Sequence, residues 1–170
     1  VGSEMCIRDR LYEDDTIQHA GVVVGLGGVA AHVLCKLPRD AEGYMGRLRC
    51  VQEISAVTAA CMMVKTSVFK AVGGFDEELK VAFNDIDLCM KVRKYGVKIV
   101  FTPYAELYHY ESKSRGMEDT PEKQLRFSRE VNCFRRKWER ELLKGDPYYN
   151  PNLTLNNTDC SLRKQEKNGD

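Results

Sequence analysis

Two aspartates separated by one residue are the first candidates for chemistry in this chain of 170 residues. They are Asp85 and Asp87 of "FNDIDLC", which follows the turn "GGFDE". Carboxylates in such a pair can hold a metal ion, act as a general base or cap a helix. Each of these roles requires its own direction of the side chains. The direction in which the predicted helix points the two carboxylates therefore decides between the roles.

A helix is predicted from Asn84 to Lys94, because Gly96 follows as a terminating residue. At the helical spacing Asp85 falls among the apolar residues and Asp87 falls on the opposite side. We therefore expect Asp85 to face the protein, where it is either a cap or a general base. Asp87 is expected to face solvent in a structural role, paired with a lysine or in a capping box with Asn84.

Strands are expected around this helix. Apolar and β-branched runs indicate them at residues 16–25, 51–65, 97–101 and 105–110. The run at 51–65 is either one buried strand or two strands broken near Thr58. The letters "TPY" after residue 101 are expected to turn the chain.

Two further helices are expected. Thr66 is predicted to cap a short helix that Gly73 and Gly74 end. Thr120, followed by proline, is predicted to start a long helix with a basic face exposed to solvent. The apolar stripe of this long helix, which we expect to pack against the domain, comprises Phe127, Val131, Phe134, Trp138 and Leu142.

The composition fits one soluble globular domain. It is 43% hydrophobic and 30% charged, with a formal net charge of +1, so nothing requires a nucleic-acid partner. Glycines interrupt the longest apolar runs, and no transmembrane segment is predicted. Seven cysteines without a C-x-x-C pair favour a reduced, cytoplasmic setting.

The first ten residues, "VGSEMCIRDR", are interpreted as a non-native segment. They contain no initiating Met, no signal-peptide layout and no helical period, and they are similar to translated adaptor sequence. They are therefore excluded from the fold prediction.

The motifs "GGFDE", "FNDIDLC" and "KIVFTPYAELYHYES", in this order, resemble the C-terminal half of bacterial family 2 glycosyltransferases. The resemblance runs from about residue 11 to 162. It implies an α/β glycosyltransferase-A fold, incomplete here, with a mixed central sheet and flanking helices. The domain boundaries that follow are residues 1–10 for the adaptor-like segment, 11–118 for the catalytic part, 119–145 for the C-terminal amphipathic helix and 146–170 for a polar tail.

The resemblance also implies a reaction, in which a sugar moves from a nucleoside-diphosphate sugar to an acceptor hydroxyl with inversion. Asp85 matches the base, and Asn84 stands where the family usually has Glu. Gly73 and Gly74 match a glycine loop beside the sugars, although a plain helix C-cap explains them equally well. The sugar-binding set is completed by Asn84 and by Thr58, which we place on the acceptor side.

His109 matches the family's histidine on a divalent cation, Mg²⁺ or Mn²⁺. Taken alone, a strand histidine between tyrosines is more typically structural. Ser112, Ser114 and Arg115 follow as hydroxyl and guanidinium groups suited to diphosphate oxygens, with a plain surface loop as the equal alternative. His19 and His32 are interpreted as structural or as supports behind the site.

The family's metal-binding Asp-x-Asp and its nucleotide-binding half have no counterpart in this sequence, so the chain as written is expected to be inactive. The alternative is a non-catalytic glycan-binding or scaffolding relative, which Asn84 favours. The acceptor implied is a glycan or lipid-linked glycan of cell-surface polysaccharide biosynthesis. The expected location is the cytoplasm, with the basic helix as a peripheral contact to the inner face of the membrane.

Overall fold

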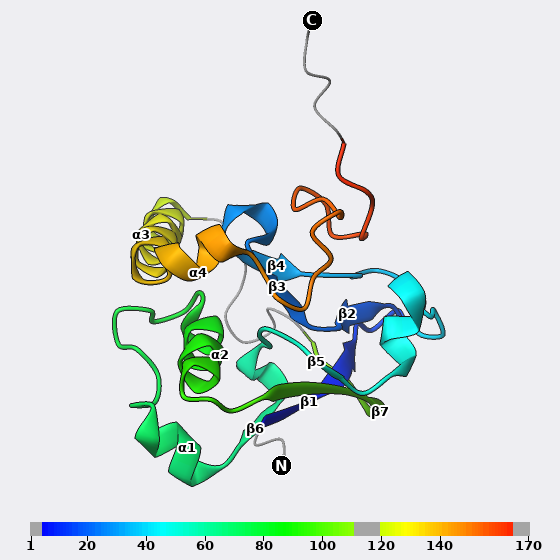
Figure 1. Ribbon diagram of the computed structural model, residues 1–170, viewed down its shortest axis with the longest axis horizontal. Coiled ribbons are helices and arrows are strands. Elements are labelled where there is room, and N and C mark those ends of the chain that lie inside the picture. Colours follow the sequence, from blue (N-terminus) through cyan, green and yellow to red (C-terminus); the bar gives the residue numbers. More distant parts are fainter. Residues whose placement is uncertain (1–4, 111–119, 165–170) are drawn as a thin grey trace, which may run out of the picture.

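The computed structural model describes residues 5–110 and 120–164, and for residues 5–10 the backbone alone. A mixed five-stranded sheet lies at its centre (Figure 1). Its order is β2-β1-β7-β5, and β6 also pairs with β1. Only β1 and β7 run parallel; the other described pairs are antiparallel. The strands are β1 (Met5–Leu11), β2 (Ile17–His19), β5 (Gln52–Glu53), β6 (Met62–Val64) and β7 (Ile99–Tyr108).

Strand β7 is longer than predicted, because one strand replaces the two short strands and the turn at "TPY". Pro103 lies inside it. The pairing with β1 passes from Arg8↔Thr102 directly to Asp9↔Glu106, so residues 103–105 form a bulge. A proline in a bulge has no ladder hydrogen bond to lose, which explains why the strand continues through it.

The expected strand at residues 16–25 is two strands. Gly21, with φ of +103°, separates β2 from β3 (Val22–Val24). β3 pairs with β4 (Ala30–His32) in a second, two-stranded sheet. The run at 51–65 also contains two strands, β5 and β6, with a 3₁₀ turn (Ala59–Cys61) between them, so the second of the two alternatives, a break near Thr58, is the one observed.

The N-terminal residues excluded from the fold prediction do form an element of the sheet. Met5–Leu11 is β1, which pairs with β2, β6 and β7. The exclusion was therefore wrong as a statement about structure, because a strand needs only main-chain hydrogen bonds to join a sheet. The adaptor origin of these residues stays a prediction.

The described residues also form four α-helices: α1 (Thr66–Ala71), α2 (Asn84–Lys94), α3 (Pro121–Lys137) and α4 (Glu139–Lys144). The bounds of α2 are the predicted ones. Thr66 is the first residue of α1 rather than its cap, whereas the Thr120 hydroxyl does cap α3 by accepting from the Lys123 N–H at 3.4 Å. The long helix ends earlier than predicted, because the chain bends at Trp138 before α4.

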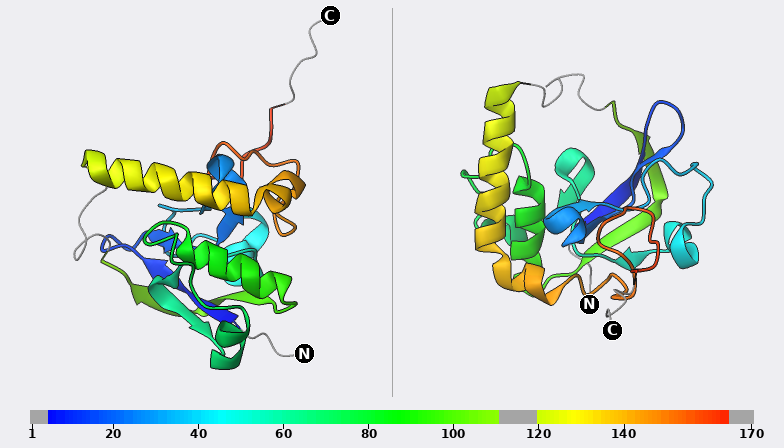
Figure 2. Two further views of the ribbon diagram at one scale, coloured as in Figure 1. Left: turned by 90° about the vertical axis from the view of Figure 1, so that its left-hand side faces the viewer. Right: turned by 90° about the horizontal axis from the view of Figure 1, so that it is seen from above.

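The helices form two layers on the sheet. Figure 2 shows α2 lying between the sheet and α3, so that both faces of α2 are covered. The fully buried side chains Leu88, Val92, Phe101 and Phe134 come from these three layers. No helix in the described ranges is long and apolar enough to cross a membrane.

The core packing predicts the effect of truncating Phe101, which is 0% exposed. Phe101→Ala should lower the free energy of unfolding by about 3–5 kcal/mol, because the cavity adds to the lost burial. Chemical denaturation followed by circular dichroism measures this change. Tyr104→Ala, on the same strand but 80% exposed, is the control and should change stability by less than about 0.5 kcal/mol. Equal losses in the two variants would contradict this position of the core.

Candidate active site

Asp85 lies in the first turn of α2. Phe83 is the N-cap residue, with φ of +63°, and its carbonyl accepts from the Asp87 N–H at 2.8 Å. Asn84 Oδ1 accepts from the Asp85 N–H at 2.7 Å, and Asp85 Oδ1 accepts from the Ile86 N–H at 2.9 Å. The side chains of this turn thus satisfy N–H groups that a helix start leaves without intrahelical partners.

The second oxygen of Asp85 reaches another element. Asp85 Oδ2 accepts from the Ala59 N–H at 2.9 Å, at the start of the 3₁₀ turn whose N-cap is Thr58. Two residues predicted for the site, Asp85 and Thr58, are thereby brought to the same place. The Asp85 carboxylate is fixed by these backbone donors. Because the residue is only half-buried, it still borders solvent.

Asp87 is fully buried, and the prediction that it faces solvent is wrong. Its Oδ1 accepts from Trp138 Nε1 at 2.8 Å and from Lys137 Nζ at 2.8 Å, and its Oδ2 lies 3.1 Å from Lys91 Nζ. The helical wheel assumed one covered face for α2. Because α3 covers the other face, the residue opposite the sheet is buried as well.

Lys137 also forms an ion pair with Asp76 in the loop before α2. Desolvation alone would lower the pKa of Lys137, but its bonds to Asp76 and Asp87 raise that pKa above the ordinary value. The same lysine holds the pKa of Asp76 below its usual range. The end of α3 is therefore a fixed positive charge between two carboxylates.

Glu130 of α3 also contributes to the site, and its role was not predicted from the sequence. It is 4% exposed, and its carboxylate accepts from the backbone N–H groups of Lys80, Val81 and Ala82 at 3.0, 3.1 and 2.8 Å. These residues directly precede Phe83. The sequence signal was weak: an acid amid basic residues on a predicted exposed helix face.

Phe83 is held from the same helix. Its ring lies 5.8 Å from the ring of Phe127 and 5.3 Å from the ring of Phe134, both in α3. Aromatic pairs at these distances stabilise one another. Together with Glu130, they position the strained turn that leads into Asp85.

Gly73 and Gly74 end α1 in the geometry of a helix C-cap. The Gly74 N–H donates to the Phe69 carbonyl at 2.9 Å and the Gly73 N–H donates to the Lys70 carbonyl at 3.2 Å, with φ of +64° and +79°. This is the paired pattern of a Schellman motif. The Gly74 carbonyl accepts from Lys91, and because Lys91 also pairs with Asp87, it connects this turn to the buried carboxylate of Asp87.

His109 directly follows β7 and is bonded to β2. Its Nδ1 lies 2.8 Å from Gln18 Oε1, and Gln18 Nε2 donates to the His109 carbonyl at 3.2 Å. In both views of Figure 2, the C-terminal end of β7, the N-terminal end of α2 and the start of α3 lie at one end of the molecule. Asp85 and His109 are therefore on the same side of the fold.

The remaining predicted residues divide into two groups. Ser112, Ser114 and Arg115 lie outside the described residues. His19 is fully buried, and its Nδ1 lies 2.8 Å from His32 Nδ1, so the two form a pair between β2 and β4. Within the described residues, no group of three His, Cys, Asp or Glu side chains could hold a metal ion.

Cys89 sits one turn after Asp85 and is a second nucleophilic group to consider. It is fully buried, its Sγ points to the Val57 carbonyl at 3.6 Å, and burial raises the pKa of its thiol. A buried thiol of this kind is chemically inert. The half-buried Asp85 is therefore a better candidate than Cys89 for exchanging a proton with a bound molecule.

Comparison with known proteins finds relatives of the chain. No family model and no solved structure matches it. The chain is 56% identical over 159 residues to "Uncharacterized protein y4gI" of Sinorhizobium fredii, covering 92% of the chain and 17% of that protein. It is 38% identical over 161 residues to "O-antigen biosynthesis protein RfbC" of Myxococcus xanthus, covering 94% of the chain and 12% of that protein. A shorter match, 36% identical over 62 residues, is to an "N-acetylglucosaminyl-diphospho-decaprenol L-rhamnosyltransferase" of Mycobacterium tuberculosis, and covers 36% of the chain and 20% of that protein.

The three bonds of Glu130 predict that Glu130→Gln is destabilising. An amide presents one acceptor oxygen and turns N–H groups toward backbone donors, so the free energy of unfolding should fall by about 2–3 kcal/mol. Amide hydrogen exchange at residues 80–82 should become faster. Glu122→Gln, an exposed acid on the same helix, is the control and should stay within about 0.5 kcal/mol of the parent. Unchanged exchange at residues 80–82 would contradict the three hydrogen bonds.

Proposed function

We propose that the protein to which this chain belongs is a glycosyltransferase, in which Asp85 is the general base. The observation that carries the proposal is the fixed, solvent-bordering carboxylate of Asp85, held by the Ala59 and Ile86 N–H groups at a helix N-terminus. The relatives named for O-antigen biosynthesis and for rhamnosyl transfer support sugar transfer as the class of reaction. The family 2 assignment and the glycosyltransferase-A fold are part of this proposal.

In the proposed reaction, an acceptor hydroxyl approaches Asp85 and gives up its proton to a carboxylate oxygen as its own oxygen attacks the anomeric carbon. The bond from that carbon to the diphosphate breaks on the opposite face, so the configuration inverts. Both carboxylate oxygens accept backbone hydrogen bonds, and these bonds fix the direction in which Asp85 receives the proton. The electron pair of the broken bond leaves with the nucleoside diphosphate.

Neighbouring groups are poor alternatives for the base. Asp87 is 0% exposed and is bonded to Trp138 and Lys137, so no acceptor reaches it. Thr58 and Asn84 border the turn and are proposed to contact the acceptor or donor sugar. Gly73 and Gly74 are proposed to line the sugars as well, in addition to ending α1.

We further propose that the reaction uses a divalent cation, Mg²⁺ or Mn²⁺, with His109 as one ligand. The contact between His109 Nδ1 and Gln18 Oε1 fits this role, because a metal-ligating histidine is typically oriented by a hydrogen bond from its other nitrogen. When bound, the cation would neutralise charge on the leaving diphosphate. Ser112, Ser114 and Arg115 are proposed to hold the same diphosphate.

The donor in this proposal is a nucleoside-diphosphate sugar, and the acceptor is a glycan or lipid-linked glycan. The proposed location is the cytoplasm, with the basic face of α3 as a peripheral contact to the inner face of the membrane. The name of the Myxococcus relative favours cell-surface polysaccharide synthesis as the setting. The chain spans less than a fifth of the Sinorhizobium and Myxococcus relatives, so these statements concern the longer protein.

Replacing the proposed base tests the function. In the full-length protein, Asp85→Asn should lower kcat for sugar transfer by roughly 10²- to 10⁴-fold, because no base then receives the proton of the acceptor hydroxyl. Circular dichroism should be unchanged. Glu77→Gln, an exposed acid on the preceding loop, should retain full activity. An Asp85→Asn protein that turns over normally would refute the base assignment, and a wild-type protein that binds glycans without transferring sugar would indicate the glycan-binding alternative.

Removing metal tests the cation. Chelation with EDTA should abolish transfer, and Mg²⁺ or Mn²⁺ should restore it. In His109→Ala, the metal concentration for half-maximal activity should rise by about tenfold or more, while Gln18→Ala should show a smaller increase of the same kind. Transfer that persists after complete chelation would refute the metal proposal.

A further inference from the structure

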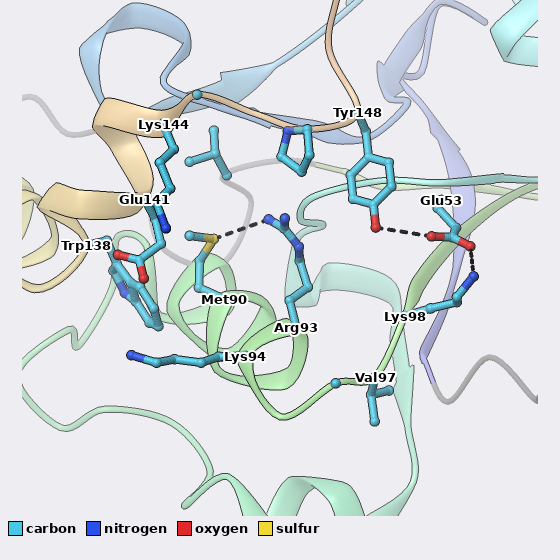
Figure 3. Close-up of a pocket in the computed structure, with 14 residues that line it drawn as sticks. Glu53, Met90, Arg93, Lys94, Val97, Lys98, Trp138, Glu141, Lys144 and Tyr148 are labelled. Atoms are coloured by element: carbon cyan, nitrogen blue, oxygen red, sulfur yellow. Dashed lines mark hydrogen bonds and ion pairs between the residues drawn. The ribbon is translucent and has the colours of Figure 1, made fainter.

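We propose that a cavity at the other end of α2, away from Asp85, binds a small organic anion that carries a ring. The cavity has a volume of about 540 Å³ and lies between the C-terminal end of α2 and residues 138–148 (Figure 3). Sites for small organic ligands have volumes of about 300–1,000 Å³ and mostly apolar walls. The proposal goes beyond sugar transfer at Asp85 and does not depend on it.

Apolar and aromatic side chains from several elements form the walls. They come from β3, α2, the turn after α2 and the segment after α3. The apolar and aromatic lining residues are Val24, Met90, Val97, Trp138, Pro147 and Tyr148. Walls of this kind suit the flat or hydrophobic face of a ring.

The charged lining residues leave a positive excess. Four are cationic, Arg93, Lys94, Lys98 and Lys144, and two are acidic, Glu53 and Glu141. Lys98 forms an ion pair with Glu53 and lowers its pKa, and the Tyr148 hydroxyl donates to the other Glu53 oxygen at 3.1 Å. With this pair neutralised, three cations face one carboxylate.

Arg93 occupies the middle of the cavity, between Met90 and Tyr148 (Figure 3). Its Nη1 donates to Ser55 Oγ at 3.1 Å, and its guanidinium lies 5.4 Å from the centre of the Tyr148 ring. These contacts hold the group in place but use few of its five N–H donors. A fixed guanidinium is well suited to a carboxylate or phosphate.

Two lysines border the same space from different helices. Lys94 extends from α2 with its Nζ 5.8 Å from the centre of the Trp138 ring, and Lys144 extends from α4 (Figure 3). Within the described part of the chain, neither lysine forms a salt bridge. All three cations lie in the last turn of a helix, Arg93 and Lys94 in α2 and Lys144 in α4, where they also neutralise the helix dipoles. The dipoles alone do not require that three cations from two helices line the same cavity.

The single tryptophan of the sequence makes the proposal testable, because Trp138 lines the cavity. The chain is titrated with phenyl phosphate and glucose 6-phosphate while tryptophan fluorescence is recorded. Phenol and glucose, which carry only the ring, and inorganic phosphate, which carries only the anion, are the controls. At least one ring phosphate should saturate the signal and bind about tenfold or more tightly than either of its halves. Comparing the two ring phosphates distinguishes an aromatic ligand from a sugar ligand.

Variants locate the binding. Lys94→Ala combined with Lys144→Ala should weaken the affinity by about fivefold or more, whereas Lys70→Ala, an exposed lysine of α1, should leave it unchanged. Calorimetric titration is the second measurement, because removing Lys94 alters the surroundings of the Trp138 ring directly. The proposal is overturned if neither ring phosphate saturates, if a neutral ring binds as tightly, or if the double variant keeps full affinity.

Discussion

The arrangement of the helices depends on one buried carboxylate, that of Asp87. A charge removed from water is stable only with partners, and here the indole of Trp138 and the ammonium groups of Lys137 and Lys91 supply them. These partners come from the end of α3 and from α2 itself. The helices α2 and α3 are thereby fixed in both separation and rotation, which apolar packing alone specifies less strictly. The turn that carries Asp85 inherits its position from this contact and from Glu130.

The sequence predicted the elements whose signals are local. The bounds of α2 followed from Gly96 and the helical period, and the start of α3 followed from Thr120 and Pro121, because caps and terminators act within one helical turn. The mixed α/β character was also predictable. The length of β7 was not, since Pro103 reads as a turn until the bulge opposite β1 is known.

The candidate site shows the same limit. Asp85 and Thr58 were each assigned to the site, but the bond that joins Asp85 to the Ala59 N–H depends on tertiary contact and was not predicted. Asp87 was placed on the wrong side because an amphipathic wheel records one buried face and α2 has two. Glu130 gave almost no signal, because its partners are backbone groups some 50 positions away, and backbone groups leave no mark in a sequence.

The pairing of β1 with β7 has a consequence for how the sheet is completed. The two strands join residues 5–11 to residues 99–108, so the centre of the sheet forms only after a long loop closes, which is a slow step in folding. The bonds that join them are main-chain bonds, which carry little information about the identity of the strand. Without β1, β7 would present an open edge of main-chain N–H and C=O groups, which is prone to pairing with a strand of another molecule.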